Sequence, residues 1–314
     1  ETRGRMNRIR SGESRSSEAE RDPVSSVDRR RVVITGVTGT LGDALARAYR
    51  ARAFEVIGVS HRSEAISSAC HRLVRSPQAT TLDAERLLDL EPDILILNAG
   101  RIETEVGVAG VPLVEATREI FTLNAIFPSL VCAAAGARGS RRRLDIVAIG
   151  SIADGSPSCF GPAYHASKSA LHSFITGVGP IVNAAHPNVR VRLYRPGVIR
   201  GPLSWAPLLR LNERGAAIRG RRCRNAPEAG RVAERIARWI DSGGWVGSDP
   251  APLSFRALQL LHAIAPDLFY RVQRLGWKRG SRFGDGAGRM LGVEGSAAGT
   301  VLGARPEPEA KRGG

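Results

Sequence analysis

Along residues 31–243, short apolar runs alternate with longer segments whose apolar positions repeat with the period of a helix. Strands are expected at the short runs, at residues 31–36, 54–60, 79–82, 93–100, 143–151 and 189–197. Helices are expected at residues 40–53, 63–74, 112–137, 163–179 and 226–243. Strands that alternate with helices form a parallel sheet covered on both faces. The pattern therefore predicts an α/β, doubly wound Rossmann-type fold, with ligands at the carboxyl ends of the strands.

The domain organisation follows from where this alternation stops. We expect one Rossmann-fold domain over residues 31–250, preceded by a disordered basic segment, residues 1–30, that lacks periodic apolar positions. Residues 251–278 predict an amphipathic helical extension, and residues 279–314, rich in Gly and Arg, predict a flexible tail. The extension is expected to pack on its own domain or on a dimer partner. The alternatives are a cover over the active site and contact with a membrane surface.

The charge of the chain is high but not informative about a partner. A formal net charge of +16 is typical of proteins that bind nucleic acid or acidic partners. Here arginine supplies nearly all of the basic residues along the whole chain, and aromatic residues make up only 5%. Biased codon usage is the simpler explanation, and no nucleic-acid partner is expected.

Cysteine and histidine spacing predicts no metal site and no disulfide framework. The four cysteines lie far apart, without a C-x-x-C motif or a cysteine–histidine cluster, at Cys70, Cys132, Cys159 and Cys223. No apolar run reaches the roughly 18 residues of a membrane-spanning helix, since the longest weakly polar stretch is residues 128–137. No signal peptide is recognised, so a cytoplasmic protein is expected.

A glycine-rich turn joins the first strand to the first helix. In TGVTGTLG (35–42), Gly36 permits a tight turn, Gly39 lets the backbone approach a pyrophosphate, and Gly42 lets helix and strand pack closely. The helix that follows points its N-terminus at the anion. The turn therefore predicts a dinucleotide site, with contacts from Gly36, Thr38, Gly39, Thr40, Leu41 and Gly42.

The end of the second strand favours NADP(H) over NAD(H). Dinucleotide sites that read NAD usually place an acidic residue here, to bind the ribose 2′-hydroxyl. This chain has Ser60 and, two residues later, Arg62, whose guanidinium suits a 2′-phosphate. The alternative is that Arg62 is a solvated arginine without this role.

The motif YHASK (164–168) places Tyr164 and Lys168 one helical turn apart, on one face. Lys168 is the only lysine in the first 277 residues. A nearby ammonium favours the phenolate and lowers the pKa of a tyrosine, which suits the tyrosine to general acid–base catalysis. Arginine would place its charge differently, which explains why a lysine stands here.

Together these motifs resemble the short-chain dehydrogenase/reductase family. TGVTGTLG, LNAG (97–100), Asn124, Ser151, YHASK and RPG (195–197) occur in the family's order over residues 31–245, and Ser151 precedes Tyr164 by the customary thirteen residues. The glycine spacing resembles that of the family's extended members, whereas the distances between the other motifs do not.

The resemblance implies a role for each matching residue. Tyr164 would exchange a proton with the substrate oxygen, Lys168 would bind the nicotinamide ribose, Ser151 would hold the substrate oxygen, and Asn124 would hold a water of the proton relay. The further cofactor contacts implied are Asp83, at the adenine amino group, then Asn98, Ala99 and Gly100 along the adenosine half, and Pro196, Gly197 and Ile199 near the carboxamide. Many relatives have a threonine after RPG, and this chain reads VIRGPL there.

The predicted function is transfer of hydride between a nicotinamide and a small carbonyl or secondary alcohol. Two alternatives stay open: an enzyme acting on nucleotide sugars or polyprenyl-phosphate sugars, and a non-catalytic dinucleotide-binding regulator. The resemblance implies that residues 198–225 form the substrate lid. Its apolar residues could cover an apolar group, and its arginines, Arg210, Arg214, Arg219, Arg221, Arg222 and Arg224, could meet an anionic one. A homodimer or homotetramer is expected, as in most relatives.

Overall fold

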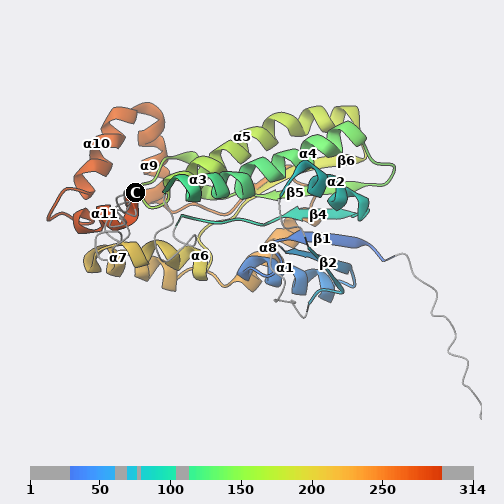
Figure 1. Ribbon diagram of the computed structural model, residues 1–314, viewed down its shortest axis with the longest axis horizontal. Coiled ribbons are helices and arrows are strands. Elements are labelled where there is room, and N and C mark those ends of the chain that lie inside the picture. Colours follow the sequence, from blue (N-terminus) through green and yellow to red (C-terminus); the bar gives the residue numbers. More distant parts are fainter. Residues whose placement is uncertain (1–28, 61–68, 76–78, 104–112, 292–314) are drawn as a thin grey trace, which may run out of the picture.

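A single parallel sheet forms the centre of the molecule (Figure 1). The computed structural model describes residues 29–60, 69–75, 79–103 and 113–291. The order of the strands is β3-β2-β1-β4-β5-β6-β7, and every neighbouring pair is parallel. The strand order reverses between β1 and β4, and such a switch point opens a crevice for ligands at the carboxyl ends. The strands are β1 (Arg31–Thr35), β2 (Glu55–Ser60), β3 (Arg72–Arg75), β4 (Ile94–Leu97), β5 (Leu144–Ile149), β6 (Val189–Arg195) and β7 (Val246–Ser248).

Helices cover both faces of the sheet, as the alternating pattern predicted. In Figure 1, α1 (Thr40–Ala51) and α8 (Ala229–Asp241) lie below the sheet, and α2 (Thr81–Asp89), α4 (Phe127–Arg138) and α5 (Pro162–Ala185) lie above it. Successive strand residues point to opposite faces. Val32 therefore packs in one hydrophobic core with α1 and α8, and Val33 packs in the other with α2, α4 and α5.

The helix expected over residues 112–137 is confirmed, with a change of pitch in its middle. α3 (Leu113–Phe121) continues through a π-helical turn, Thr122–Ile126, into α4. Among the described residues, Ala116–Arg138 is long and apolar enough to cross a membrane, although the sequence had suggested no such helix. It lies against the sheet and buries Asn124 completely, so it is a core helix of this fold.

The expected third strand, residues 79–82, is wrong. This stretch begins α2, because Thr80 and Asp83 form a capping box in which each side chain bonds to the backbone N–H of the other. The strand is instead β3, which lies within the helix expected at residues 63–74; residues 61–68 of that helix lie outside the described part of the chain. β3 is a short edge strand with only two apolar residues, so it left no strong pattern.

The C-terminal part is more structured than the sequence indicated. Residues 251–278 contain two helices, α9 (Leu253–Ile264) and α10 (Pro266–Gly276). Residues 279–291, expected to be part of a flexible tail, include α11 (Ala287–Leu291), and Phe283 packs against Phe160 with ring centroids 4.9 Å apart. The expected lid is also helical, with α6 (Pro202–Trp205) and α7 (Glu213–Arg224). Short 3-10 helices cover Ile152–Gly155, Ala206–Arg210 and Gly284–Gly286.

Candidate functional site

The glycine-rich turn has the geometry that a dinucleotide pyrophosphate requires. Gly36 has a φ of +66°, and a Cβ there would lie 2.7 Å from the Cα of Ala99. A Cβ on Gly42 would overlap the carbonyl oxygen of Gly36. α1 begins after Gly39 without a side-chain cap, so its first N–H groups remain available to an anion. The residues present therefore fit the cofactor predicted from the sequence.

The ends of β1 and β4 are tied together beneath this turn. The hydroxyl of Thr35 accepts hydrogen bonds from the backbone N–H groups of Asn98 and Ala99, at 3.0 and 3.1 Å. The Asn98 amide in turn donates to the carbonyl oxygen of Thr35, at 3.1 Å. Asn98 therefore fixes the crevice through the backbone. The sequence suggested contact with the adenosine for Asn98, but missed the role of Thr35.

The adenosine end of the site differs from the expectation at one position. Ser60 ends β2, is buried, and its hydroxyl lies 3.4 Å from that of Thr38. Arg62 lies outside the described residues. Asp83 was expected after a strand, where it would receive the adenine amino group. It lies instead in the first turn of α2, where its carboxylate accepts from the N–H and the hydroxyl of Thr80. Asp83 therefore does not follow a strand, and its expected place after a strand was the reason to assign it an adenine contact.

Asn124 lies at the centre of the π-helical turn and is completely buried. Its side-chain oxygen accepts from the N–H of Arg101 at 2.8 Å, and its amide donates to the Arg101 carbonyl and the Ser167 hydroxyl, at 2.9 and 3.0 Å. The local widening of a π-turn is often found at functional sites. Here it directs Asn124 toward the segment after β4 and toward α5, beside Gly100.

Tyr164, Lys168 and Ser151 meet at the carboxyl end of β5. Tyr164 lies in the first turn of α5, half-buried, and the ammonium of Lys168 lies 5.9 Å from the centre of its ring. Ser151 lies two residues after the end of β5 and is buried. Its hydroxyl accepts a hydrogen bond from the N–H of Ala153 at 3.1 Å. The helix and the strand end bring together side chains that are well separated in the sequence.

The ammonium of Lys168 is buried, with an exposed fraction of 4%. It donates to the carbonyl oxygen of Ile149 at 2.8 Å. Burial lowers the pKa of Lys168 from 10.5 to about 8, while the negative charge of Asp154 acts in the opposite direction. Asp154 is itself held by Arg195, whose Nε lies 2.7 Å from its Oδ2, and by His172 at 2.9 Å. A fixed carboxylate thus supports a lysine that would otherwise lose its proton more easily.

Glu103 is a residue of this site that the sequence analysis missed. Its Oε1 accepts from the N–H groups of Ala163 and, at 3.1 Å, of Tyr164, so it caps the N-terminus of the helix that carries Tyr164. Glu103 is only 2% exposed, and its Oε2 has no hydrogen-bond partner among the described residues. Burial raises the pKa of this carboxyl, although the two N–H groups act against that change.

We expect Glu103→Ala to destabilise the fold by about 1–2 kcal/mol, because two N–H groups at the start of α5 lose their acceptor. Glu103→Gln keeps an acceptor oxygen and should melt close to the wild type. The measurement is thermal unfolding followed by circular dichroism, with the exposed Glu119→Ala as the matched control. Equal melting temperatures for Glu103→Ala and Glu119→Ala would show that the cap contributes nothing.

The RPG loop, which follows β6, is anchored by the residue that follows the neighbouring strand, β7. Asp249, which follows β7, accepts from the N–H of Gly197 at 3.0 Å and from the hydroxyl of Tyr194 at 2.6 Å, and it pairs with Arg235 at 2.7 Å. Burial and the carboxylate of Asp249 raise the pKa of Tyr194 to about 12, and Arg235 acts in the opposite direction. Ile199 packs its side chain on the core beside α1 and α8. The backbone at Pro196 and Gly197 is therefore held rigidly next to the crevice.

The lid and the C-terminal helices enclose the catalytic loop. A Cβ on Gly201 would lie 3.2 Å from the hydroxyl oxygen of Thr40, so the lid begins beside the glycine-rich turn. Gln259 of α9 donates to the carbonyl oxygen of Ile152 at 2.9 Å, and Gln273 of α10 accepts from the N–H of Cys159 at 3.3 Å. The extension therefore contacts its own domain, which was one of the two arrangements expected for it.

One lid arginine faces this loop without a carboxylate partner among the described residues. The guanidinium carbon of Arg219 lies 3.9 Å from the centre of the Phe160 ring, and burial lowers the pKa of Arg219 to about 10. Phe160 also contacts Trp277, with ring centroids 5.6 Å apart. The half-buried guanidinium of Arg219 therefore covers an aromatic residue of the loop that joins Ser151 to Tyr164.

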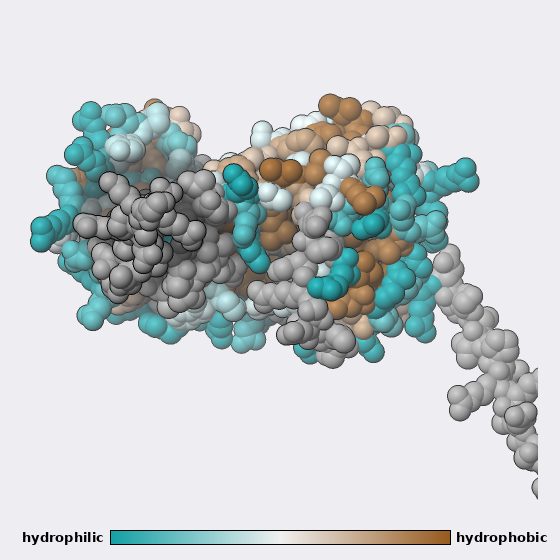
Figure 2. All heavy atoms as spheres, viewed as in Figure 1, coloured by the Kyte–Doolittle hydropathy of each residue, from teal (hydrophilic) through white to brown (hydrophobic). Residues whose placement is uncertain are grey.

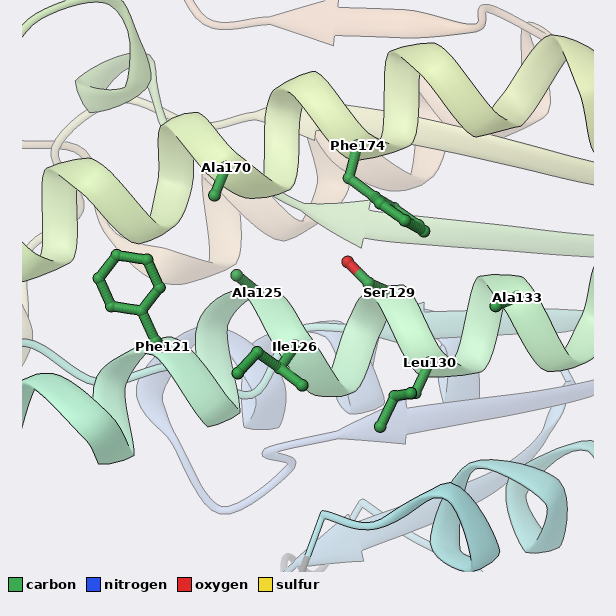
Figure 3. A pocket seen from close by; sticks show the side chains of 8 residues that line it. All are labelled: Phe121, Ala125, Ile126, Ser129, Leu130, Ala133, Ala170 and Phe174. Atoms are coloured by element: carbon green, nitrogen blue, oxygen red, sulfur yellow. The ribbon is translucent and has the colours of Figure 1, made fainter.

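A separate apolar groove lies on the outer surface between α4 and α5. It has a volume of about 350 Å³ and is lined almost entirely by apolar side chains, including Ile126 and Leu130, and Figure 3 shows Phe121 and Phe174 extending between the two helices. Ile126 and Phe174 are 49% and 37% exposed. Figure 2 shows apolar side chains gathered over these two helices. The groove is distinct from the crevice at the strand ends.

Comparisons with known proteins agree with this geometry. A sequence model of the family described as short chain dehydrogenase matches residues 85–206, which include Asn124, Ser151, Tyr164 and Lys168. A curated relative, dehydrogenase/reductase SDR family member 7B from Rattus norvegicus, is 27% identical over 266 residues, which are 77% of this chain and 79% of that protein.

Solved structures share the fold. A short-chain dehydrogenase/reductase from Burkholderia phymatum in complex with NAD matches with a TM-score of 0.61 and 20% identity, over 76% of this chain and 95% of that one. A short chain dehydrogenase from Burkholderia cenocepacia in complex with NADP matches with a TM-score of 0.56 and 17% identity, over 78% and 98%. Both cofactors therefore occur among the proteins that this chain resembles.

Proposed function

We propose that the chain is a short-chain dehydrogenase/reductase, which its fold and the family match over residues 85–206 support, and that it reduces a carbonyl compound, or oxidises the corresponding alcohol, with NADP(H). The observation that carries the proposal is the pairing of Tyr164 with a buried Lys168 at the carboxyl end of β5. Burying an ammonium is costly. A lysine that only filled space would be unexpected here, in a chain with three lysines among its 46 basic residues.

The cofactor would be held along the crevice by the glycine-rich turn, by the backbone at Ala99 and Gly100, and by the RPG loop that Asp249 anchors. The nicotinamide supplies the hydride, and the protein supplies binding, orientation and proton transfer. A side chain on Gly36 or Gly42 would clash with the backbone of Ala99 or of Gly36, and would therefore displace the turn itself.

The proton transfer is assigned to the side chains of the protein. Tyr164 donates its phenolic proton to the substrate oxygen during reduction, and accepts a proton from the alcohol in the reverse direction. The charge of Lys168 favours the phenolate, and the hydroxyl of Ser151 donates to the oxygen on which negative charge develops. Asn124, held by Arg101 and Ser167, keeps the segment between β4 and α5 in place beside the lysine.

The choice of NADP(H) depends on Arg62, which follows the buried end of β2. We expect Arg62→Ala to weaken NADPH binding at least about tenfold and to leave NADH binding unchanged, because a guanidinium bonds a 2′-phosphate in a bidentate manner. The measurement is titration of the wild type and the variant with each cofactor, followed by nicotinamide fluorescence. Arg72→Ala, an exposed arginine on β3, is the matched control.

Each result of this titration has a clear meaning. Tight NADPH binding that Arg62→Ala abolishes supports the proposed preference. Tighter binding of NADH than of NADPH would contradict the assignment of Arg62. Binding of neither cofactor by the wild type would contradict the oxidoreductase itself and would favour a non-catalytic protein.

Arg219 supports an anionic substrate. Its guanidinium stacks on Phe160 beside the catalytic loop, and no carboxylate among the described residues pairs with it. A carboxylate or phosphate on the substrate would supply the missing partner. Self-association is supported by a different feature, the apolar groove between α4 and α5, which a second copy of the chain would cover.

A further inference from the structure

The two C-terminal helices have an outer surface that is unusually apolar. Of the seventeen exposed large hydrophobic residues in the described part of the chain, eight lie between Leu253 and Leu275. Soluble monomers rarely expose contiguous apolar surface on this scale without a partner. The eight are Leu253, Leu258, Leu260, Ile264, Leu268, Tyr270, Val272 and Leu275.

These residues form a stripe on each helix. On α9, Leu253, Leu260 and Ile264 follow helical spacing and are 82%, 61% and 72% exposed. On α10, Leu268, Val272 and Leu275 also lie at helical intervals, four and three residues apart, and are 51%, 43% and 57% exposed. Other side chains of these two helices contact the rest of the protein. Phe269 is buried, and Gln259 and Gln273 form hydrogen bonds with the catalytic loop. The packing of the extension on its own domain therefore leaves the outer stripes without a partner among the described residues.

The charges around the stripes are almost all positive. Between Leu253 and Arg282 the chain has one acidic residue, Asp267, which pairs with Arg271 at 2.9 Å. All six basic residues of this stretch are exposed: Arg256, Arg271, Arg274, Lys278, Arg279 and Arg282. A second copy of the chain docked on this surface would bring the same cations face to face, which opposes a symmetric dimer here. An anionic lipid surface accepts both the apolar stripes and the cations.

We propose that α9 and α10 dock the protein on the surface of a membrane that contains anionic lipids. The exposed tyrosine, Tyr270, adds a side chain that favours the interface between lipid and water. Because the inner faces of these helices contact the loop that carries Ser151, docking places the catalytic cleft next to the lipid surface. The proposal goes beyond the proposed oxidoreductase and does not depend on it, since membrane binding requires no turnover.

The test is sedimentation of the full chain with vesicles, one set of equal parts phosphatidylglycerol and phosphatidylcholine, the other of phosphatidylcholine alone. We expect the wild type to sediment with the anionic vesicles and to be released by high salt. Leu260→Glu and Ile264→Glu should each lower the apparent partition coefficient at least about tenfold. Leu82→Glu is the matched control: Leu82 is 54% exposed on α2, at the opposite end of the molecule (Figure 1).

Three results would overturn the proposal. The first is a wild type that stays in the supernatant with both kinds of vesicle. The second is equal sedimentation of Leu260→Glu, Ile264→Glu and Leu82→Glu, which would assign the binding to charges elsewhere in the chain. The third is a wild type that dimerises in size-exclusion chromatography and becomes monomeric in Leu260→Glu, which would make a second copy the partner of this surface. Unchanged thermal unfolding of the three variants shows that each is folded.

Discussion

Replacement of Tyr164 by phenylalanine should lower kcat by about a thousandfold or more while leaving the fold and cofactor binding intact. The hydroxyl is the group assigned to proton transfer, and a positioned acid or base typically contributes about 10²–10⁴ in rate. The backbone N–H of Tyr164 would still donate to Glu103, so the start of α5 should not move. The measurement is steady-state NADPH oxidation with a carbonyl substrate, together with the NADPH affinity of the variant.

The matched control for this substitution is Tyr270→Phe, which removes the same hydroxyl from a residue that is 66% exposed on α10. It should retain wild-type kinetics. If Tyr164→Phe turned over at the wild-type rate, the acid would have to be another group, and the central assignment would be wrong.

Replacement of Lys168 by methionine should abolish most of the activity and yet stabilise the protein at neutral pH. The folded state lowers the pKa of Lys168 from 10.5 to about 8. This shift corresponds to about 3 kcal/mol of unfavourable interaction for the buried ammonium. Loss of the hydrogen bond to Ile149 offsets about 1 kcal/mol of this, so a net gain of about 1–2 kcal/mol is expected.

The pH dependence of this gain has a definite sign. Below pH 8 the lysine is protonated in both states, and the wild type carries the full penalty. Between pH 8 and 10.5 the unfolded chain binds a proton that the folded chain lacks, so the wild type becomes relatively more stable as pH rises. The advantage of Lys168→Met in the free energy of unfolding should therefore shrink from pH 7 to pH 10.

The exposed Lys278→Met is the control for this experiment, because its ammonium is not buried and its removal should change neither stability nor rate. A Lys168→Met protein that was less stable than the wild type at pH 7 would show that the ammonium has stabilising partners in the fold. A variant with normal activity would remove the lysine from the mechanism.

The sheet was predictable because parallel strands are buried on both faces and appear as continuous apolar runs. β1, β2, β4 and β5 largely have this pattern, whereas β6 also contains arginines, and the sequence located each of the five to within a few residues. β3 and β7 lie at the edges, contain few apolar residues, and were missed or misplaced. The error at β3 displaced the assignment of Asp83, whose pairing with Thr80 is a helix-capping pattern that an apolar-run analysis does not detect.

The candidate site was predictable where the residues form a local motif. Tyr164 and Lys168 share one helix face, and the glycines of the first turn lie three residues apart in the sequence. Glu103 has no such signature, because its burial arises from a helix that begins about sixty residues later in the chain. The contact of Gln259 with Ile152 spans more than a hundred residues. Contacts of this kind are set by tertiary packing and leave no periodic trace.

Transfer of deuterium from C4-deuterated NADPH to a product alcohol is the most direct test of the proposed chemistry. The substrates are ketones with neutral, carboxylate and phosphate substituents, and mass spectrometry of the product reports the label. We predict that the wild type incorporates deuterium at the carbinol carbon, with preference for an anionic ketone, and that Tyr164→Phe gives almost no product. A wild type that binds NADPH tightly and labels none of the ketones, or a Tyr164→Phe protein that labels them equally well, would contradict the account.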